Sequence, residues 1–164
     1  MSNKDMLVIG LGNPLRGDDG VGIWIAEQIA AADWPDVMVL AIESGEPTQL
    51  IEAWAGAKRV YVVDALVAPL PPGRVLRFDL LRNPVPAHLA TFSTHGLGLS
   101  EAVQLARILG ALPSKLTLYG IVGQQFAYGV SLTPEVATAA QYVVARLRRL
   151  LRHAATPGQH RSPQ

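Results

Sequence analysis

Two carboxylates and one imidazole in this chain have the types and the positions to act together on a cation. Asp19 follows the first apolar run, Asp64 comes directly after another apolar run, and His95 precedes a predicted helix. Residues that follow the carboxyl ends of parallel strands gather at one edge of a sheet. Such ligands suit zinc, nickel or another divalent ion, and three of them leave room for water or a substrate group.

Each of these residues also has a purely structural interpretation. Carboxylates at the start of a helix oppose its dipole, which would explain Asp19 and is the interpretation we favour for its neighbour Asp18. Asp64 could hydrogen-bond within the loop that follows it. A lone histidine such as His95 is commonly structural. The residues alone therefore leave open both a cation site and a set of unrelated structural roles.

The loop at 10–22, which reads GLGNPLRGDDGVG, looks at first like a phosphate-binding turn between a strand and a helix. Two aspartates at the start of that helix would repel a phosphate. The third glycine of a dinucleotide-binding fingerprint is also missing, because Leu15 stands at its position. The loop is therefore predicted to present a carboxylate to a positively charged group.

The elements that would position these residues follow from hydrophobic periodicity and turn residues. Strands are predicted at 6–11, 37–42, 59–63, 74–78 and 116–122, the fourth of them antiparallel. Helices are predicted from Asp18, at 49–55, near 100–109 and from Pro134. This alternation favours one α/β domain at 1–152, with three α/β/α layers and a mostly parallel twisted sheet, followed by a flexible tail at 153–164.

The composition narrows the function classes. The chain has 164 residues, a formal net charge of +1 and no cysteine. It lacks the charge that nucleic acid or a membrane surface would attract, so neither is expected as a partner. The absence of cysteine removes thiolate metal sites and a cysteine nucleophile. No signal peptide is visible and no apolar run approaches the roughly 20 residues of a membrane span, so a cytoplasmic protein is expected.

Three motifs in order resemble those of the hydrogenase maturation proteases. They are the loop at 10–22, the segment VVDA at 62–65 and the segment THGL at 94–97. The resemblance implies a phosphorylase/hydrolase-like α/β fold and a cytoplasmic endopeptidase that removes the C-terminal extension of the nickel-iron hydrogenase large subunit. It also implies that Asp19, Asp64 and His95 are both the catalytic and the metal-contacting residues.

The resemblance further implies that the nickel arrives with the substrate rather than being held by the free enzyme. The expected partner is the precursor large subunit, bound transiently by a monomer. An empty site of two carboxylates and an imidazole repels itself and gains from a divalent ion. One segment departs from the family pattern: residues 43–46 read ESGE, where many members carry an Asp-Gly-Gly type of sequence. That difference leaves the particular partner open.

Two other functions compete with this one. The segment GLGNP at 10–14 is also similar to peptidyl-tRNA hydrolase, but that enzyme then carries a catalytic histidine where this chain has Arg16 to Asp19. A non-enzymatic nickel-binding chaperone would use the same three ligands. Hydrolysis of a peptidyl-tRNA by the purified protein would favour the first of these functions, and cleavage of a hydrogenase precursor would decide against a pure chaperone.

Overall fold

We describe the chain from a computed structural model, which covers residues 5–86, 90–91 and 95–155 and leaves aside the side chains of 90, 91, 95–97 and 155. The strands are β1 (Met6–Leu11), β2 (Val37–Ile42), β3 (Arg59–Val67), β4 (Val75–Asp79), β5 (Ala90–Thr91) and β6 (Lys115–Val122). The helices are the short 3-10 helix η1 (Gly17–Gly20), α1 (Val21–Ala30), α2 (Pro47–Trp54), α3 (His95–Leu109) and α4 (Pro134–Ala155).

The strands form one sheet in the order β2-β1-β3-β6-β4, with β5 added at the end of β3. The neighbours β1 and β2, β1 and β3, and β3 and β6 are parallel. β4 is antiparallel to β6, which confirms the predicted direction of that strand. The carboxyl ends of the four parallel strands therefore share one edge of the sheet, where such folds place their sites.

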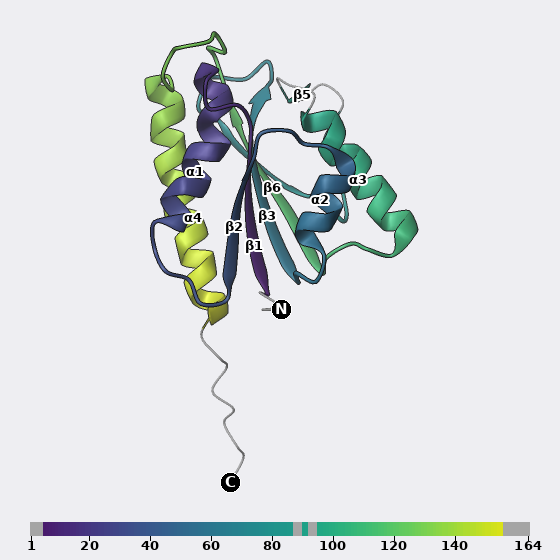
Figure 1. Ribbon diagram of the computed structural model, residues 1–164. Helices are drawn as coiled ribbons and strands as arrows, with labels where there is room; N and C mark the ends of the chain where they lie inside the picture. The colour runs from purple at the N-terminus through teal and green to yellow at the C-terminus, as the bar shows by residue number, and fades with distance from the viewer. Residues whose placement is uncertain (1–4, 87–89, 92–94, 156–164) are drawn as a thin grey trace.

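Helices cover both faces of the sheet, so the predicted three-layer α/β/α fold is confirmed. α1 and α4 lie on one face, and α2 and α3 lie on the other (Figure 1). The first face buries Val8, Val63 and Ile121 against α1 and α4. The second face buries the alternate residues of the same strands, such as Ile9 and Val62, against α2 and α3. Burial on both faces explains why these strands are almost continuously apolar.

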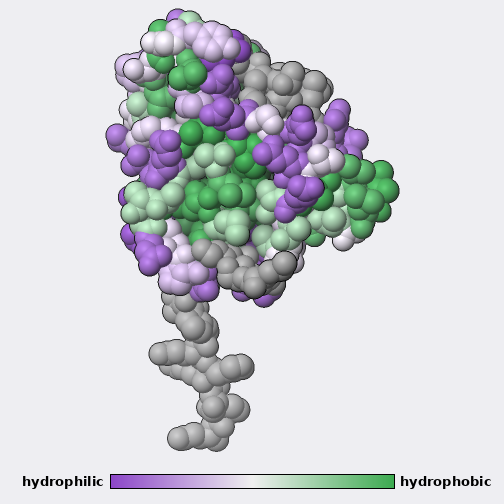
Figure 2. Space-filling model, in the orientation of Figure 1, coloured by the Kyte–Doolittle hydropathy of each residue, from purple (hydrophilic) through white to green (hydrophobic). Residues whose placement is uncertain are grey.

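Apolar residues also reach the surface at two places in Figure 2. One group lies over β2, the edge strand, where Met38 is exposed. The other lies at the carboxyl end of α3, where Ile108 and Leu109 are exposed. Within the described ranges, no helix has the length and apolar character needed to cross a bilayer.

The loop at 10–22 owes two of its glycines to close packing of α1 on the sheet. A side chain on Gly10 would overlap the Gly22 carbonyl, and a Cβ on Gly22 would lie 2.5 Å from the Val63 carbonyl oxygen. Here the backbone of α1 touches that of β1 and β3 directly. These two glycines therefore allow the start of α1 to pack directly against Val63, the residue that precedes Asp64.

Replacing Gly22 with alanine is expected to cost roughly 2–3 kcal/mol, because an added methyl group in a filled core forces the backbone apart. Urea denaturation would measure the loss. Gly20→Ala is the matched control, since Gly20 has φ −80° and its nearest Cβ contact would be 3.1 Å away. Equal losses for the two variants would contradict the packing role of Gly22.

Three predicted boundaries are wrong in informative ways. β3 does not stop before Asp64 but continues to Val67, because β6 and β5 pair with its last residues. α3 starts at His95 rather than near Ser100. α4 continues to Ala155, so the first residues assigned to the tail at 153–164 are helical. The remainder of that tail lies outside the described residues.

The first helix does not begin as predicted at Asp18. Residues Gly17–Gly20 form the 3-10 helix η1, and the regular helix starts at Val21. Asp18 and Asp19 thus lie in a tight turn that precedes α1 rather than in its first turn. This turn contacts β3 and carries both side chains into the protein.

Candidate active site

Asp19 lies in η1, just beyond the carboxyl end of β1, and only 1% of it is exposed. The backbone amide of Asn13 donates a hydrogen bond of 3.1 Å to Asp19 Oδ2. A Cβ at residue 12 would overlap the Asp19 carbonyl, and Gly12 has φ +136°. Gly12 is therefore required both by its own conformation and by the close approach of η1. The turn after β1 is folded back so that the Asp19 carboxylate is held inside it.

Asp64 occupies β3 one residue beyond the last pairing of β3 with β1, which joins Gly10 and Val63. It is fully buried. The amide of Ala65 donates a hydrogen bond of 2.8 Å to Asp64 Oδ1, whereas Oδ2 has no hydrogen-bond partner among the described residues. Side chains alternate along a strand, so Asp64 faces the α2 and α3 layer, on the same side as Val62. A buried carboxylate oxygen without a donor requires an explanation, because such atoms are normally satisfied.

The two carboxylates influence each other. Burial raises the pKa of Asp64 well above its usual range, and the negative charge of Asp19 raises it further, while the hydrogen bond from Ala65 opposes both effects. The sequence-based expectation that Asp19 and Asp64 come together at one edge is thus supported by their electrostatic coupling. A buried carboxylate pair of this kind is relieved by a proton or by a cation.

His95 is the first residue of α3, and its side chain lies outside the described residues. The backbone places the start of α3 at the same edge as the carboxylates, because β5 pairs with Leu66 and Val67 at the end of β3 and contacts α3. No group of three His, Asp or Glu side chains within the described part of the chain could hold an ion. The contribution of His95 to a ligand set therefore stays a prediction.

The segment that departs from the family pattern contacts the start of α3. A Cβ at Gly98 would overlap the carbonyl of Gly45, so the backbones of the two glycines touch. Glu43 and Glu46 are exposed on the same loop, as predicted for solvated charges. Glycines lower helix propensity, and this contact explains why residue 98 is a glycine although it lies inside α3.

Asp18 has a role that its position in the sequence does not reveal. It is fully buried. Its carboxylate accepts hydrogen bonds from the backbone amides of Gln124 (2.8 Å), Gln125 (2.9 Å) and Thr133 (2.8 Å), and from the Thr133 hydroxyl (3.0 Å). The interpretation of Asp18 as a helix-start charge is therefore wrong. Asp18 fastens the loop that precedes α4 to the turn that carries Asp19.

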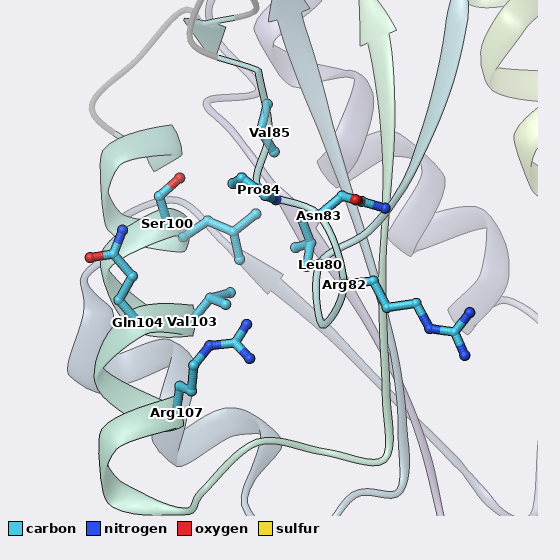
Figure 3. Close-up of a pocket in the computed structure, with 10 residues that line it drawn as sticks. Leu80, Arg82, Asn83, Pro84, Val85, Ser100, Val103, Gln104 and Arg107 are labelled. Atoms are coloured by element: carbon cyan, nitrogen blue, oxygen red, sulfur yellow. The ribbon is translucent and has the colours of Figure 1, made fainter.

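A separate cavity of about 340 Å³ lies between α3 and the segment after β4. Figure 3 shows Val103 and Arg107 of α3 on one side of it and Leu80 on the other, with the guanidinium of Arg82 turned away. Its lining includes neither Asp19 nor Asp64. Among the described residues, this cavity and the carboxylate pair are therefore separate features.

The fold and the buried carboxylates define a doubly wound α/β protein with a candidate site at the carboxyl edge of the sheet. The chain belongs to the hydrogenase maturation protease family, whose model, described as "Hydrogenase maturation protease", matches residues 23–149. This match contains the positions of Asp64 and His95 and begins just after Asp19. Family membership makes the chain a protease of the endopeptidase type.

Individual relatives agree with this assignment. Hydrogenase 2 maturation protease of Escherichia coli (strain K12) is 30% identical over 151 residues, which are 87% of this chain and 90% of that protein. The hydrogenase expression/formation protein HupD of Rhodobacter capsulatus is 29% identical over 90% of this chain and 71% of its own length. The structure of the hydrogenase maturating endopeptidase HybD from E. coli superimposes with a TM-score of 0.73 at 26% identity, covering 92% of this chain and 93% of that one.

Proposed function

We propose that this chain is the endopeptidase that removes the C-terminal extension of a nickel-iron hydrogenase large-subunit precursor, and that it acts after nickel insertion. The observation that carries the proposal is the buried carboxylate pair, in which Asp64 Oδ2 has no hydrogen-bond donor among the described residues. Its family and the name of its E. coli relative, a hydrogenase 2 maturation protease, support the choice of substrate.

The donor set of the site fits a divalent cation. Asp19 and Asp64 supply buried oxygen ligands, and the charge of Asp19 together with burial disfavours ionisation of Asp64 when the site holds only protons. With His95 at the same edge, the set is one that nickel or zinc accepts. Bound there, a divalent ion polarises a carbonyl oxygen or activates water. We propose that the ion is nickel carried by the precursor, so that recognition of the substrate and the test for its nickel are the same event.

Asp19, Asp64 and His95 would then have different roles in binding the precursor and in cleaving it. Asp19 and Asp64 position the nickel-bearing end of the precursor, because a cation offsets the repulsion between two ionised carboxylates in a buried site. One carboxylate accepts a proton from the water that attacks the scissile peptide, which is general-base chemistry within the reach of a buried Asp. His95 is the third proposed ligand. We assign no metal to the free enzyme.

The proposal predicts that the purified protein shortens a nickel-loaded large-subunit precursor and leaves the nickel-free precursor intact. Mass spectrometry of the precursor before and after incubation measures the cleavage. His95→Ala is expected to lower the rate at least 100-fold, the scale on which loss of a positioned catalytic group acts. Asp33→Asn, a change at an exposed carboxylate, is the control that should cleave normally.

Each competing function has a distinct outcome in the same experiment. Equal cleavage of loaded and nickel-free precursor would overturn recognition through nickel. Tight binding of nickel by the isolated protein without any cleavage would identify a chaperone instead. Hydrolysis of peptidyl-tRNA together with inert precursors would identify the esterase, although family membership favours the protease.

A further inference from the structure

We propose that an apolar surface next to the carboxylate pair is the place where the protein substrate docks, a proposal that rests on the proposed function. The surface consists of Leu15, Tyr128 and Val130, and we call it the Leu15–Tyr128–Val130 surface. The exposed fractions of these residues are 67%, 69% and 40%. Its occupant is the precursor polypeptide that flanks the nickel-bearing end, bound through apolar side chains.

The surface is assembled from two loops that are far apart in the sequence. The amide of Gly129 donates a hydrogen bond of 2.9 Å to the Leu15 carbonyl. The Arg16 guanidinium lies 4.9 Å from the centre of the Tyr128 ring, and Arg16 Nε donates a hydrogen bond of 3.3 Å to the Phe126 carbonyl. These contacts hold the exposed tyrosine in a defined position, which lowers the entropic cost of binding through it.

The same two loops are joined beneath the surface by Asp18. Its buried carboxylate accepts the amides of Gln124, Gln125 and Thr133, which lie on either side of Tyr128. The buried Asp18 carboxylate thus fixes the conformation of a loop that exposes apolar side chains to water. Exposed apolar side chains held in a fixed conformation are typical of a surface that a partner covers.

A small cavity beside the surface favours a protein partner over a small molecule. It has a volume of about 130 Å³, and its lining combines the apolar residues Pro14, Ile23, Trp24, Val130 and Leu132 with the polar residues Glu27 and Ser131. This volume is below the roughly 300–1,000 Å³ of typical small-molecule sites. A cavity of that size next to an exposed tyrosine can accept one apolar side chain from a protein, in the manner of an interface anchor.

Continuity with the carboxylate pair identifies which protein it would be. Leu15 and Asp19 belong to one turn, which is closed by the hydrogen bond from the Asn13 amide to Asp19 Oδ2 and by the Asp19 amide on the Arg16 carbonyl. A polypeptide bound at Asp19 therefore has the surface within a few residues of its path. A substrate that is itself a folded protein must contact the surface around the site, and the Leu15–Tyr128–Val130 surface is an apolar part of that surface among the described residues.

The test compares two exposed tyrosines, Tyr128 and Tyr142, of which the second lies on α4 with 61% exposure. With nickel-loaded precursor, Tyr128→Ser and Leu15→Ser are each expected to raise KM about 10-fold, with kcat changed less than about 3-fold, the pattern of lost uniform binding. Tyr142→Ser should match the wild type, and Tyr128→Phe should restore most of the affinity. The Tm of each variant checks that it is folded.

Two results would overturn the proposal. One is an unchanged KM for both Leu15→Ser and Tyr128→Ser in folded proteins. The other is a change in oligomeric state: if these variants alter the mass of the enzyme measured by sedimentation but leave KM unaltered, the surface is a contact between two copies of the chain. Failure of the wild type to cleave any precursor would refute the proposed function instead, so the two failures are distinguishable.

Discussion

The Asp64→Asn variant is expected to lose processing of the precursor by at least 100-fold, the scale of a positioned catalytic group, while the metal-free protein becomes more stable. The amide oxygen of the introduced asparagine can still accept the hydrogen bond from the Ala65 amide, which is 2.8 Å long in the wild type. The substitution removes a buried charge that faces the charge of Asp19. At neutral pH we expect a gain of about 1 kcal/mol, or roughly 3 °C in Tm.

The sign of this effect follows from the raised pKa of Asp64. Burial and the charge of Asp19 favour the protonated form in the folded state, whereas the unfolded chain titrates near the ordinary value of 3.8. The stability that Asp64 contributes is therefore complete below that value and is lost as the pH rises through the raised pKa of the folded state. The advantage of Asn over Asp at this position should grow from acidic to neutral pH.

Thermal unfolding of both proteins across that pH range measures the difference, and precursor cleavage measures the loss of function. Asp33→Asn provides the matched control, because Asp33 is exposed and its replacement should change neither quantity. A lower Tm of Asp64→Asn at neutral pH would contradict the electrostatic account of the site.

The Asp18→Ala variant is expected to have the largest effect on folding, a loss of about 4 kcal/mol. It leaves the amides of Gln124, Gln125 and Thr133 without their acceptor, and each buried group deprived of its partner costs roughly 1–3 kcal/mol. Since these amides are partly buried, water offsets some of the total. Urea denaturation would measure the loss, and the variant's apparent KM for precursor should rise with it, because the loop that carries Tyr128 is released.

Asp18→Asn separates charge from hydrogen bonding at this position. An amide oxygen can replace one carboxylate oxygen but not both, so this variant should lose less stability than Asp18→Ala. Asp33→Ala is the control for removing an unrelated carboxylate. A loss below about 1 kcal/mol for Asp18→Ala, the value of an ordinary single hydrogen bond, would show that the loop is held by other contacts.

Local pattern was sufficient to predict much of this fold. The strands Met6–Leu11 and Val37–Ile42 have the predicted bounds, because continuous apolar runs between turn residues are typical of buried strands. The placement of Asp19 and Asp64 at one sheet edge followed from the parallel direction of β1 and β3. The sheet topology expected from the sequence was therefore sufficient to predict that Asp19 and Asp64 lie at the same edge.

The features that the sequence did not predict depend on contacts between segments that are distant in the sequence. Asp18 bonds to residues more than 100 positions away, and no short motif encodes that separation. The first turn of α3 includes Gly98, whose backbone packs on the distant Gly45 with no room for a side chain. Asp64 lies within a longer strand because β5 and β6 extend the pairing. The metal-binding and catalytic roles of Asp19, Asp64 and His95 stay predictions.

The contact between Gly45 and Gly98 has a consequence for exchanging parts between relatives. Their backbones touch so closely that residue 98 cannot carry a side chain, because a Cβ there would overlap the Gly45 carbonyl. The backbone path of the loop after β2 is therefore constrained at Gly45 by the first turn of α3. A chimera that imports the loop of another member must import the beginning of α3 with it. The backbone of this loop and the start of α3, where His95 lies, are in this sense inherited as one block.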